Sequence, residues 1–159
     1  MSQRPFDVVA YGATGFVGRL VVRYFATSPA ASSLRWALGG RDRSRLEAVR
    51  NSAGSAAQKA SILVADSRDA TAVGALVSQS RIVLNTAGPF AMYGDLIVEA
   101  CVRYGTHYVD ITGETPWIRR LIDRHHATAA KNGTRIVPSC GFDSVPSDLG
   151  ACLMVQHRE

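Results

Sequence analysis

Three glycines spaced three residues apart, Gly12, Gly15 and Gly18, follow a short β-branched segment at residues 6–11. The first glycine allows a tight turn, the second lets the backbone approach an anion, and the third lets a helix lie close to a sheet. The amides at the start of that helix would then face a pyrophosphate. This spacing predicts a dinucleotide-binding loop, although a glycine-rich turn that binds nothing has the same composition. The residues expected to contact the cofactor here are Gly12, Ala13, Thr14, Gly15, Phe16, Val17 and Gly18.

Arginines follow the second predicted strand, at the position where dinucleotide sites distinguish their two cofactors. Sites for NAD(H) place Asp or Glu there to accept hydrogen bonds from the ribose hydroxyls. This chain has glycines followed by Arg41, with Arg43 and Arg45 close behind. A guanidinium binds a 2′-phosphate through paired hydrogen bonds, so Arg41 predicts NADP(H). Two alternatives stay open: Asp42 could point at the ribose in place of Arg41, and the arginines could form a solvated helix face.

Two further segments are expected at the same edge of the sheet, because ligands of open α/β sheets bind at the carboxyl ends of the strands. Asp66 ends the third predicted strand and could contact the adenine amino group or serve as an ordinary turn residue. Residues 85–89 end the fourth strand, and their small side chains would let the backbone run beside a ribose. A plain tight turn would need the same residues. The expected contacts there are Thr86, Ala87, Gly88 and Pro89.

The sequence does not reveal a catalytic residue. Neither lysine of the chain has a tyrosine four residues before it, so the catalytic pair of short-chain dehydrogenases is absent, and no Gly-x-Ser-x-Gly motif supports serine hydrolysis. Asp110 and Glu114 follow the fifth predicted strand, near where a nicotinamide ring would project. Each could act as a general acid or make turn and capping contacts. The polar segment 139–148 follows the sixth strand and could form the floor of the nicotinamide pocket.

Arginine dominates the charge of the chain, which has 18 basic and 13 acidic residues and a net charge of +5. The arginines are scattered without a basic run, which argues against a nucleic-acid partner. Cys101, Cys140 and Cys152 have no metal-ligand spacing and are expected to be reduced core thiols in a cytoplasmic protein. No uncharged apolar run reaches the roughly 18 residues that a membrane helix needs. The N-terminus does not resemble a signal peptide.

Short β-rich segments alternate with helical patterns along the chain. This alternation predicts an α/β fold with a mostly parallel, six-stranded sheet and helices on both faces. Right-handed crossovers make it a doubly wound Rossmann fold with strand order 3-2-1-4-5-6. The predicted strands are residues 6–11, 34–38, 61–65, 81–86, 106–111 and 134–138.

The helices are predicted from apolar stripes and capping residues. The first helix, residues 15–26, would begin after a Thr14 cap, and Asp69 and Asp95 would cap two later helices. Thr115 would cap the long helix that precedes the sixth strand, with the proline after it at the first helical position. The stripe that the first helix is expected to bury comprises Phe16, Val17, Leu20, Val21, Tyr24 and Phe25.

A length of 159 residues corresponds to one domain, and the 47% of hydrophobic residues is typical of globular chains. The whole chain is expected to be a dinucleotide-binding domain whose core spans residues 5–138. Residues 139–159 would form a loop and the start of a helix that leads to a substrate domain lacking in this chain. Apolar surface near residues 138–157 would then be uncovered, which predicts self-association or poor solubility.

Three segments together resemble one family: Y-G-A-T-G-F-V-G at residues 11–18, V-D-I-T-G-E at 109–114 and C-G-F-D-S-V-P-S-D at 140–148. The chain resembles the N-terminal part of saccharopine dehydrogenase-like oxidoreductases, in particular the actinobacterial trans-acting enoyl reductases. The resemblance covers nearly the whole chain and implies NADP-dependent hydride transfer. For the enoyl reductases it implies reduction of a carbon–carbon double bond in a lipid or polyketide substrate, presented by a polyketide synthase or an acyl carrier. These relatives carry a second α/β domain.

Three functions therefore remain in view. The chain could be the cofactor-binding domain of such an oxidoreductase. It could instead be a non-catalytic NADP-binding module that senses redox state or regulates a partner, which the missing tyrosine–lysine pair and the missing substrate domain also fit. The third alternative is a degenerate fragment without a ligand.

Overall fold

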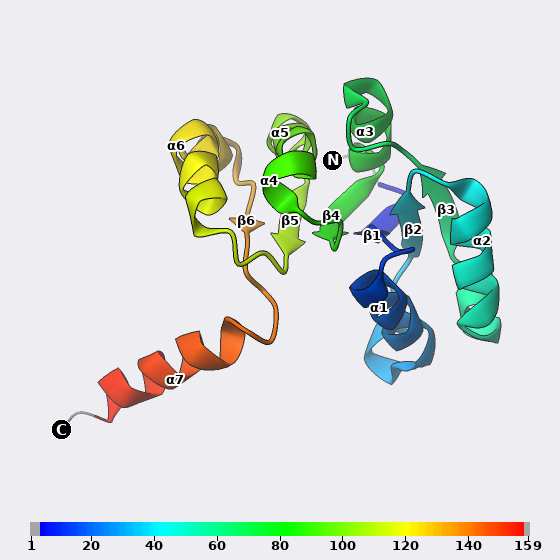
Figure 1. The fold of residues 1–159 in the computed structure, drawn as a ribbon, viewed down its shortest axis with the longest axis horizontal. Coiled ribbons are helices and arrows are strands. Elements are labelled where there is room, and N and C mark those ends of the chain that lie inside the picture. Colours follow the sequence, from blue (N-terminus) through cyan, green and yellow to red (C-terminus); the bar gives the residue numbers. More distant parts are fainter. Residues whose placement is uncertain (1–3, 158–159) are drawn as a thin grey trace.

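A computed structural model describes residues 4–157 as one sheet of six parallel strands with helices around it (Figure 1). The strand order is β3-β2-β1-β4-β5-β6, as predicted. The strands are β1 (Phe6–Tyr11), β2 (Trp36–Gly40), β3 (Ser61–Val64), β4 (Ser80–Asn85), β5 (His107–Asp110) and β6 (Ile136–Val137). The helices are α1 (Phe16–Thr27), α2 (Arg43–Ser52), α3 (Ala70–Val77), α4 (Phe90–Tyr93), α5 (Asp95–Tyr104), α6 (Thr115–Asn132) and α7 (Val145–Gln156).

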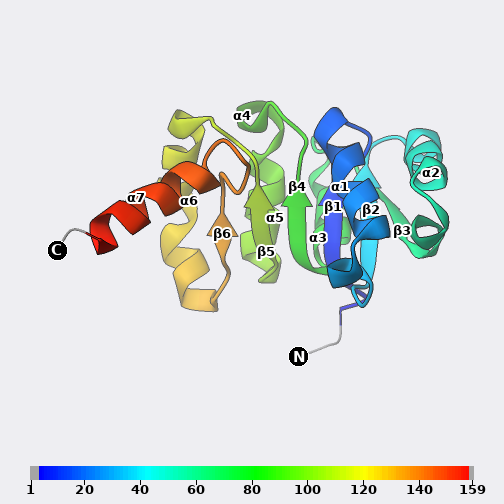
Figure 2. The ribbon, with the colours of Figure 1, turned by 90° about the horizontal axis from the view of Figure 1, so that it is seen from below.

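The helices cover the two faces of the sheet unequally. On one face α3, α5 and α6 pack over the strands, and the core there includes Val83, Tyr108 and Trp117. On the other face α1 and α2 cover the β1–β3 half, around Val22 and Leu46. Figure 2 shows β4 and β5 with no helix in front of them on this second face, and α7 extending away from the sheet. Among the described helices, none is long and apolar enough to cross a membrane.

The second strand lies two residues later in the chain than the sequence predicted. Gly39 and Gly40 do not follow the strand but are its last two residues, and they pair with Tyr11 of β1 and Val64 of β3, respectively. A Cβ atom at Gly39 would lie 3.1 Å from side-chain carbons of Tyr11 and Val9. Glycine in this strand therefore makes room for the larger side chains of the neighbouring strand, and Arg41 follows the strand directly.

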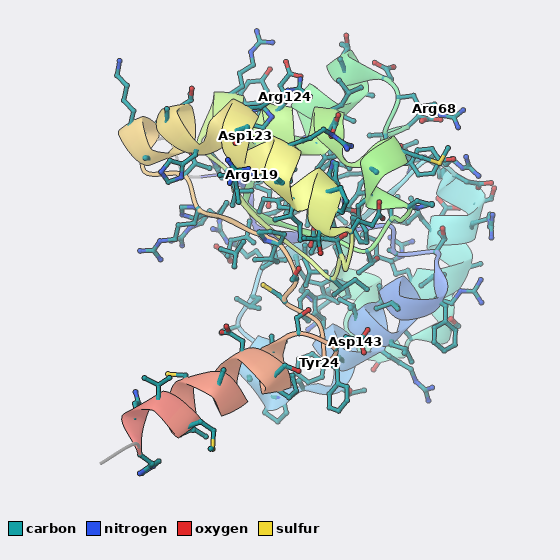
Figure 3. The ribbon with its side chains drawn as sticks, turned by 60° about the vertical axis from the view of Figure 1, so that its left-hand side comes forward. Tyr24, Arg68, Arg119, Asp123, Arg124 and Asp143 are labelled. Atoms are coloured by element: carbon teal, nitrogen blue, oxygen red, sulfur yellow. The ribbon has the colours of Figure 1, made fainter. Side chains whose placement is uncertain are left out.

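The orientation of α1 also differs from the prediction. The side chains of Phe16, Leu20 and Tyr24 are 84%, 51% and 58% exposed, whereas Gly18 and Val22 are buried. Figure 3 shows Tyr24 projecting outward from the helix. The apolar stripe was misread because a glycine, which no hydrophobic pattern counts, lies on the buried face. Its lack of a side chain lets α1 approach the sheet on that side.

The predicted caps have different outcomes. Thr115 is not a cap but the first residue of α6, and Glu114 is the N-cap residue before it. Asp69 caps α3 and accepts hydrogen bonds from the amides of Thr71 and Ala72, as expected. Asp95 is not a cap but the first residue of α5, and its carboxylate accepts from the Trp117 indole at 2.6 Å. Its second oxygen lies 3.3 Å from the guanidinium of Arg124 on α6 (Figure 3). The short helix α4, which precedes it, was not predicted.

Candidate functional site

The glycine loop brings the carboxyl ends of β1 and β4 together. Gly12 has a φ of 81°, a conformation that glycine adopts readily, and a Cβ atom there would lie 2.7 Å from the Ala87 amide nitrogen. Thr86 donates through its amide and its hydroxyl to the Tyr11 carbonyl, each at 2.9 Å. The loops after β1 and β4 therefore lie side by side at the crevice where the strand order reverses, the usual place of a dinucleotide.

The first turn of α1 has no side-chain cap. Gly15 is the N-cap residue and no side chain accepts from the amides beyond it, so the predicted Thr14 cap is wrong. The helix starts one residue later than that cap required, and Arg19 Nε instead donates to the Thr14 carbonyl at 3.1 Å. Gly18 packs so closely that a Cβ atom would lie 2.1 Å from the Gly12 carbonyl oxygen. Free amides beside a backbone path without side chains fit a pyrophosphate.

The aspartate that competed with Arg41 in the sequence analysis has a structural role. Asp42 is the N-cap residue of α2 and accepts from the Arg45 amide at 3.0 Å and from the Ser44 hydroxyl at 2.9 Å. The hydrogen bond from the Arg45 amide lowers the pKa of Asp42 below its usual range. Arg41, next to it, is exposed at the end of β2. The Asp42 carboxylate is thus engaged by α2, and the role of Arg41 toward a ribose substituent stays a prediction.

A groove between α1 and α2 brings further positive charge to the glycine loop. Its volume is about 250 Å³, and Arg19 and Arg45 line it together with Thr14. Arg19 is not among the residues predicted to contact the cofactor. Its position directly after Gly18, near the start of the predicted helix, was the signal that could have identified it. The β2 side of the glycine loop is therefore basic, which suits a phosphate-bearing ligand.

The turn after β3 holds the predicted Asp66. One oxygen of its carboxylate accepts from the Arg68 amide at 2.9 Å, an ordinary turn contact. Arg68 (Figure 3) lies 5.2 Å over the ring of Tyr93 in α4 and donates to its hydroxyl at 3.2 Å. The Tyr11 hydroxyl donates to the Ala65 carbonyl at 3.0 Å. Asp66 thus makes the turn contact, and its contact with adenine stays a prediction.

Asp110 is a buried carboxylate, 1% exposed, at the end of β5. It accepts hydrogen bonds from the Tyr108 hydroxyl at 2.7 Å and from the amides of Thr112 and Ser139 at 3.0 and 2.9 Å. The Tyr108 hydroxyl also accepts from the Asn85 amide group at 3.1 Å. Burial raises the pKa of Asp110, against the effect of these donors. The network joins the ends of β4, β5 and β6.

Glu114 makes the capping contacts that were one of its two predicted roles. Its two carboxylate oxygens accept from the amides of Phe90 and Ala91, at 2.6 and 2.9 Å, at the start of α4. These amides follow the cis peptide bond between Gly88 and Pro89. The loop after β4 is therefore bound to the loop after β5 through one carboxylate.

The cysteines differ in environment. Cys101 is buried in the core as predicted, whereas Cys140 and Cys152 are exposed, so the expectation of core thiols holds only for the first. Burial and the nearby Asp110 raise the pKa of the Cys140 thiol, which keeps it protonated at neutral pH. Within residues 4–157, no cluster of His, Cys, Asp and Glu has the arrangement of a metal site.

Replacement of Asp110 by asparagine tests the buried network. We expect Asp110→Asn to lower the free energy of unfolding by about 1–3 kcal/mol, because the amide group has one oxygen where the carboxyl group has two, and both are contacted. Burial raises the pKa of Asp110 in the folded state above its value in the unfolded chain. The contribution of Asp110 to stability is therefore greatest at a pH below its pKa in the unfolded chain, and it falls as the pH rises through its pKa in the folded state. The gap between wild type and variant should therefore narrow from about pH 4 toward neutral pH.

Denaturant unfolding at several pH values measures this gap. Asp123→Asn on the surface of α6 is the control, since Asp123 is exposed and pairs with Arg119 at 2.8 Å (Figure 3). A gap that widens toward neutral pH would contradict the assigned role of burial.

The sequence matches the family model of the saccharopine dehydrogenase NADP binding domain over residues 8–137. It is 47% identical over 147 residues to a trans-acting enoyl reductase of Mycobacterium leprae, covering 92% of this chain and 35% of that protein. A trans-acting enoyl reductase of Mycobacterium bovis is 43% identical over 148 residues, which cover 93% of this chain and 35% of the relative. The chain thus spans about a third of the length of these relatives.

Solved structures share the fold at low sequence identity. The apo saccharopine dehydrogenase (L-Glu forming) of Saccharomyces cerevisiae superposes with a TM-score of 0.69 at 18% identity, over 87% of this chain and 28% of that one. AtPrR2 with NADP+ and (+)pinoresinol superposes with a TM-score of 0.59 at 12% identity, over 86% and 49% of the two chains. With the family match spanning most of the chain, the conclusion is direct: this chain belongs to the saccharopine dehydrogenase family as its NADP-binding domain.

Proposed function

We propose that this domain holds NADPH for the reduction of an enoyl group in a lipid or polyketide acyl substrate. The observation that carries the proposal is the uncapped, glycine-lined start of α1 at the crevice between β1 and β4, with Arg41 at the end of β2. The similarity to trans-acting enoyl reductases supports the oxidoreductase over the regulatory module. Bound NADPH would supply a hydride, and the domain's residues would bind and orient the cofactor.

The two halves of the cofactor would lie on the two halves of the sheet. The amides of the glycine loop, in residues 12–18, would bind the pyrophosphate, and Arg41 the 2′-phosphate. The backbone of residues 86–89 would run beside a ribose, and the nicotinamide would extend toward the ends of β5 and β6. Enoyl reduction adds a hydride to one carbon and a proton to the next. Both carboxylates at this edge, Asp110 and Glu114, accept backbone hydrogen bonds, so we assign the proton donor to neither.

The acyl substrate would be presented by a polyketide synthase or an acyl carrier. A cytoplasmic location is part of the same proposal, since the described cysteines are free thiols, which suits a reducing compartment.

An enoyl acyl-thioester tests the enzymatic proposal with two proteins: this chain alone, and this chain extended beyond Glu159 with the C-terminal segment of a mycobacterial relative. We expect the extended chain to reduce the substrate, and the chain alone to reduce it more slowly or not at all. The measurement is the fall in absorbance at about 340 nm as the reduced nicotinamide of NADPH is oxidised, together with analysis of the product. Binding of NADPH without turnover by either version would contradict the enzymatic proposal.

Arg41 is proposed as the determinant of cofactor choice. A hydrogen bond to a charged group contributes about 1.5–3 kcal/mol, so Arg41→Ala should weaken NADPH binding about 10- to 100-fold. NADH lacks the 2′-phosphate, and its affinity should not change. Fluorescence titration with both cofactors measures the two affinities.

The matched control is Arg103→Ala, because Arg103 lies in the last turn of α5, just before β5 begins at His107, whereas the glycine loop follows the end of β1. Equal affinities of the unmodified chain for NADPH and NADH, or no loss with Arg41→Ala, would remove Arg41 from the site.

We also propose that the chain self-associates through apolar surface near α7. Leu149 and Leu153, one helical turn apart on α7, are 57% and 54% exposed, and Val137 at the edge of the sheet is 46% exposed. Exposed apolar surface of this kind favours association. We expect light scattering to show species larger than a monomer as the concentration rises, and the double variant Leu149→Ser, Leu153→Ser to shift the distribution toward the monomer. Gln156→Ala on the same helix is the control. A monodisperse monomer of the unmodified chain at high concentration would contradict the proposal.

A further inference from the structure

We propose that Glu114 is a positioning residue that sets the loop after β4 for the nicotinamide half of the cofactor. This role rests on the proposed function, because it concerns the same cofactor site. Glu114 is the last residue of the V-D-I-T-G-E segment, and this role differs from proton donation. The contacts of its side-chain carboxylate and of its backbone amide support the proposal.

The side chain of Glu114 holds the segment that follows Pro89. Oε1 accepts from the Phe90 amide at 2.6 Å and Oε2 from the Ala91 amide at 2.9 Å. Hydrogen bonds from amides to an ionised carboxylate are shorter and stronger than those between neutral groups. Since each oxygen has one of the two adjacent amides, the carboxylate fixes both the position and the direction of this turn of backbone.

The backbone of Glu114 is itself anchored to the buried network. Its amide donates to the Thr112 hydroxyl at 3.0 Å, and the Thr112 amide donates to Asp110 at 3.0 Å. The Ser139 hydroxyl donates to the Thr112 carbonyl at 2.8 Å. A continuous path of hydrogen bonds therefore runs from the buried end of β5 to the loop after β4, and Glu114 is its last member.

The place of this loop in the fold relates it to one half of the cofactor. A doubly wound sheet consists of two mononucleotide-binding halves, and a dinucleotide lies across the crevice between them. β1, β2 and β3 with Arg41 form the half proposed for the adenosine 2′-phosphate. Glu114 and the loop that it holds belong to the half formed by β4, β5 and β6. Loss of the Glu114 contacts should therefore affect binding of the nicotinamide half and leave the adenosine half unchanged.

The contacts of the Phe90 side chain link the orientation of the backbone at Phe90 to the position of the loop before it. Its ring is buried and packs against Trp117, with the ring centroids 5.9 Å apart. Gly88 lies under the same ring, because a Cβ atom there would be 3.4 Å from Phe90 Cε2. A turn that rotates at Phe90 would therefore displace Gly88, one of the residues proposed to run beside the ribose.

Glu114→Gln tests the proposal with two ligands of different length. Adenosine 2′,5′-bisphosphate can occupy only the adenosine half, whereas NADPH occupies both. The amide nitrogen of glutamine would face one backbone amide, so we expect the variant to bind NADPH about tenfold more weakly, the loss of about one net hydrogen bond. Its affinity for adenosine 2′,5′-bisphosphate should stay within about twofold of wild type. A role confined to stability would not separate the two affinities.

Two further variants complete the experiment. Thr112→Val keeps the shape of the buried side chain but removes the hydroxyl that accepts from the Glu114 amide. This variant serves if Glu114→Gln does not fold, and it should weaken NADPH binding by a smaller factor while leaving the affinity for adenosine 2′,5′-bisphosphate unchanged. Glu99→Gln, at an exposed position of α5, is the matched control. Equal losses for both ligands, or no loss for NADPH, would overturn the role of Glu114. If the unmodified chain binds neither ligand, the proposed cofactor site fails and this role with it.

Discussion

The carboxyl edge of the sheet depends on a buried carboxylate, because a charge removed from water costs several kcal/mol unless hydrogen bonds replace its hydration. Asp110 obtains three such bonds, from the Tyr108 hydroxyl and from the amides of Thr112 and Ser139. Tyr108 and Thr112 lie next to Asp110 in and after β5, whereas Ser139 follows β6, so the loops after β5 and β6 can satisfy Asp110 together only in one relative position. The geometry of this half of the site thus follows from the requirement of a single buried group.

The two halves of the site are built on opposite principles. The first half lacks side chains, because a Cβ atom at Gly12 or Gly18 would collide with neighbouring backbone, and no side chain caps the first turn of α1. At the second half, side chains hold the backbone, with carboxylates of Asp110 and Glu114 binding amides of three loops. Open amides and arginines favour an anion, which is what the pyrophosphate and 2′-phosphate end of NADP(H) requires.

The strand and the helix that differ from prediction both depend on a glycine. Local periodicity counts side chains, whereas the position of an element in a sheet depends on which backbones approach closely. Gly18 turns α1 so that Phe16 and Leu20 face outward, and Gly39 lies inside β2 because Tyr11 fills the space that it leaves. Asp95 has the residue type of a cap but binds the Trp117 indole from another helix. None of these contacts is visible within a short window of sequence.

The alternation of strands and helices, the parallel strand order and the glycine loop were all determined by the sequence alone, because they depend on hydrophobic periodicity and on the conformations that glycine permits. The place of Arg41 after β2 followed from the same pattern. Only the tertiary structure decided that Asp42 is committed to a helix cap, and that Asp110 and Glu114 hold loops. The same carboxyl group can cap a helix, bind the amides of a loop or act as a general acid. The donors that reach it from distant parts of the chain determine which of these roles it has.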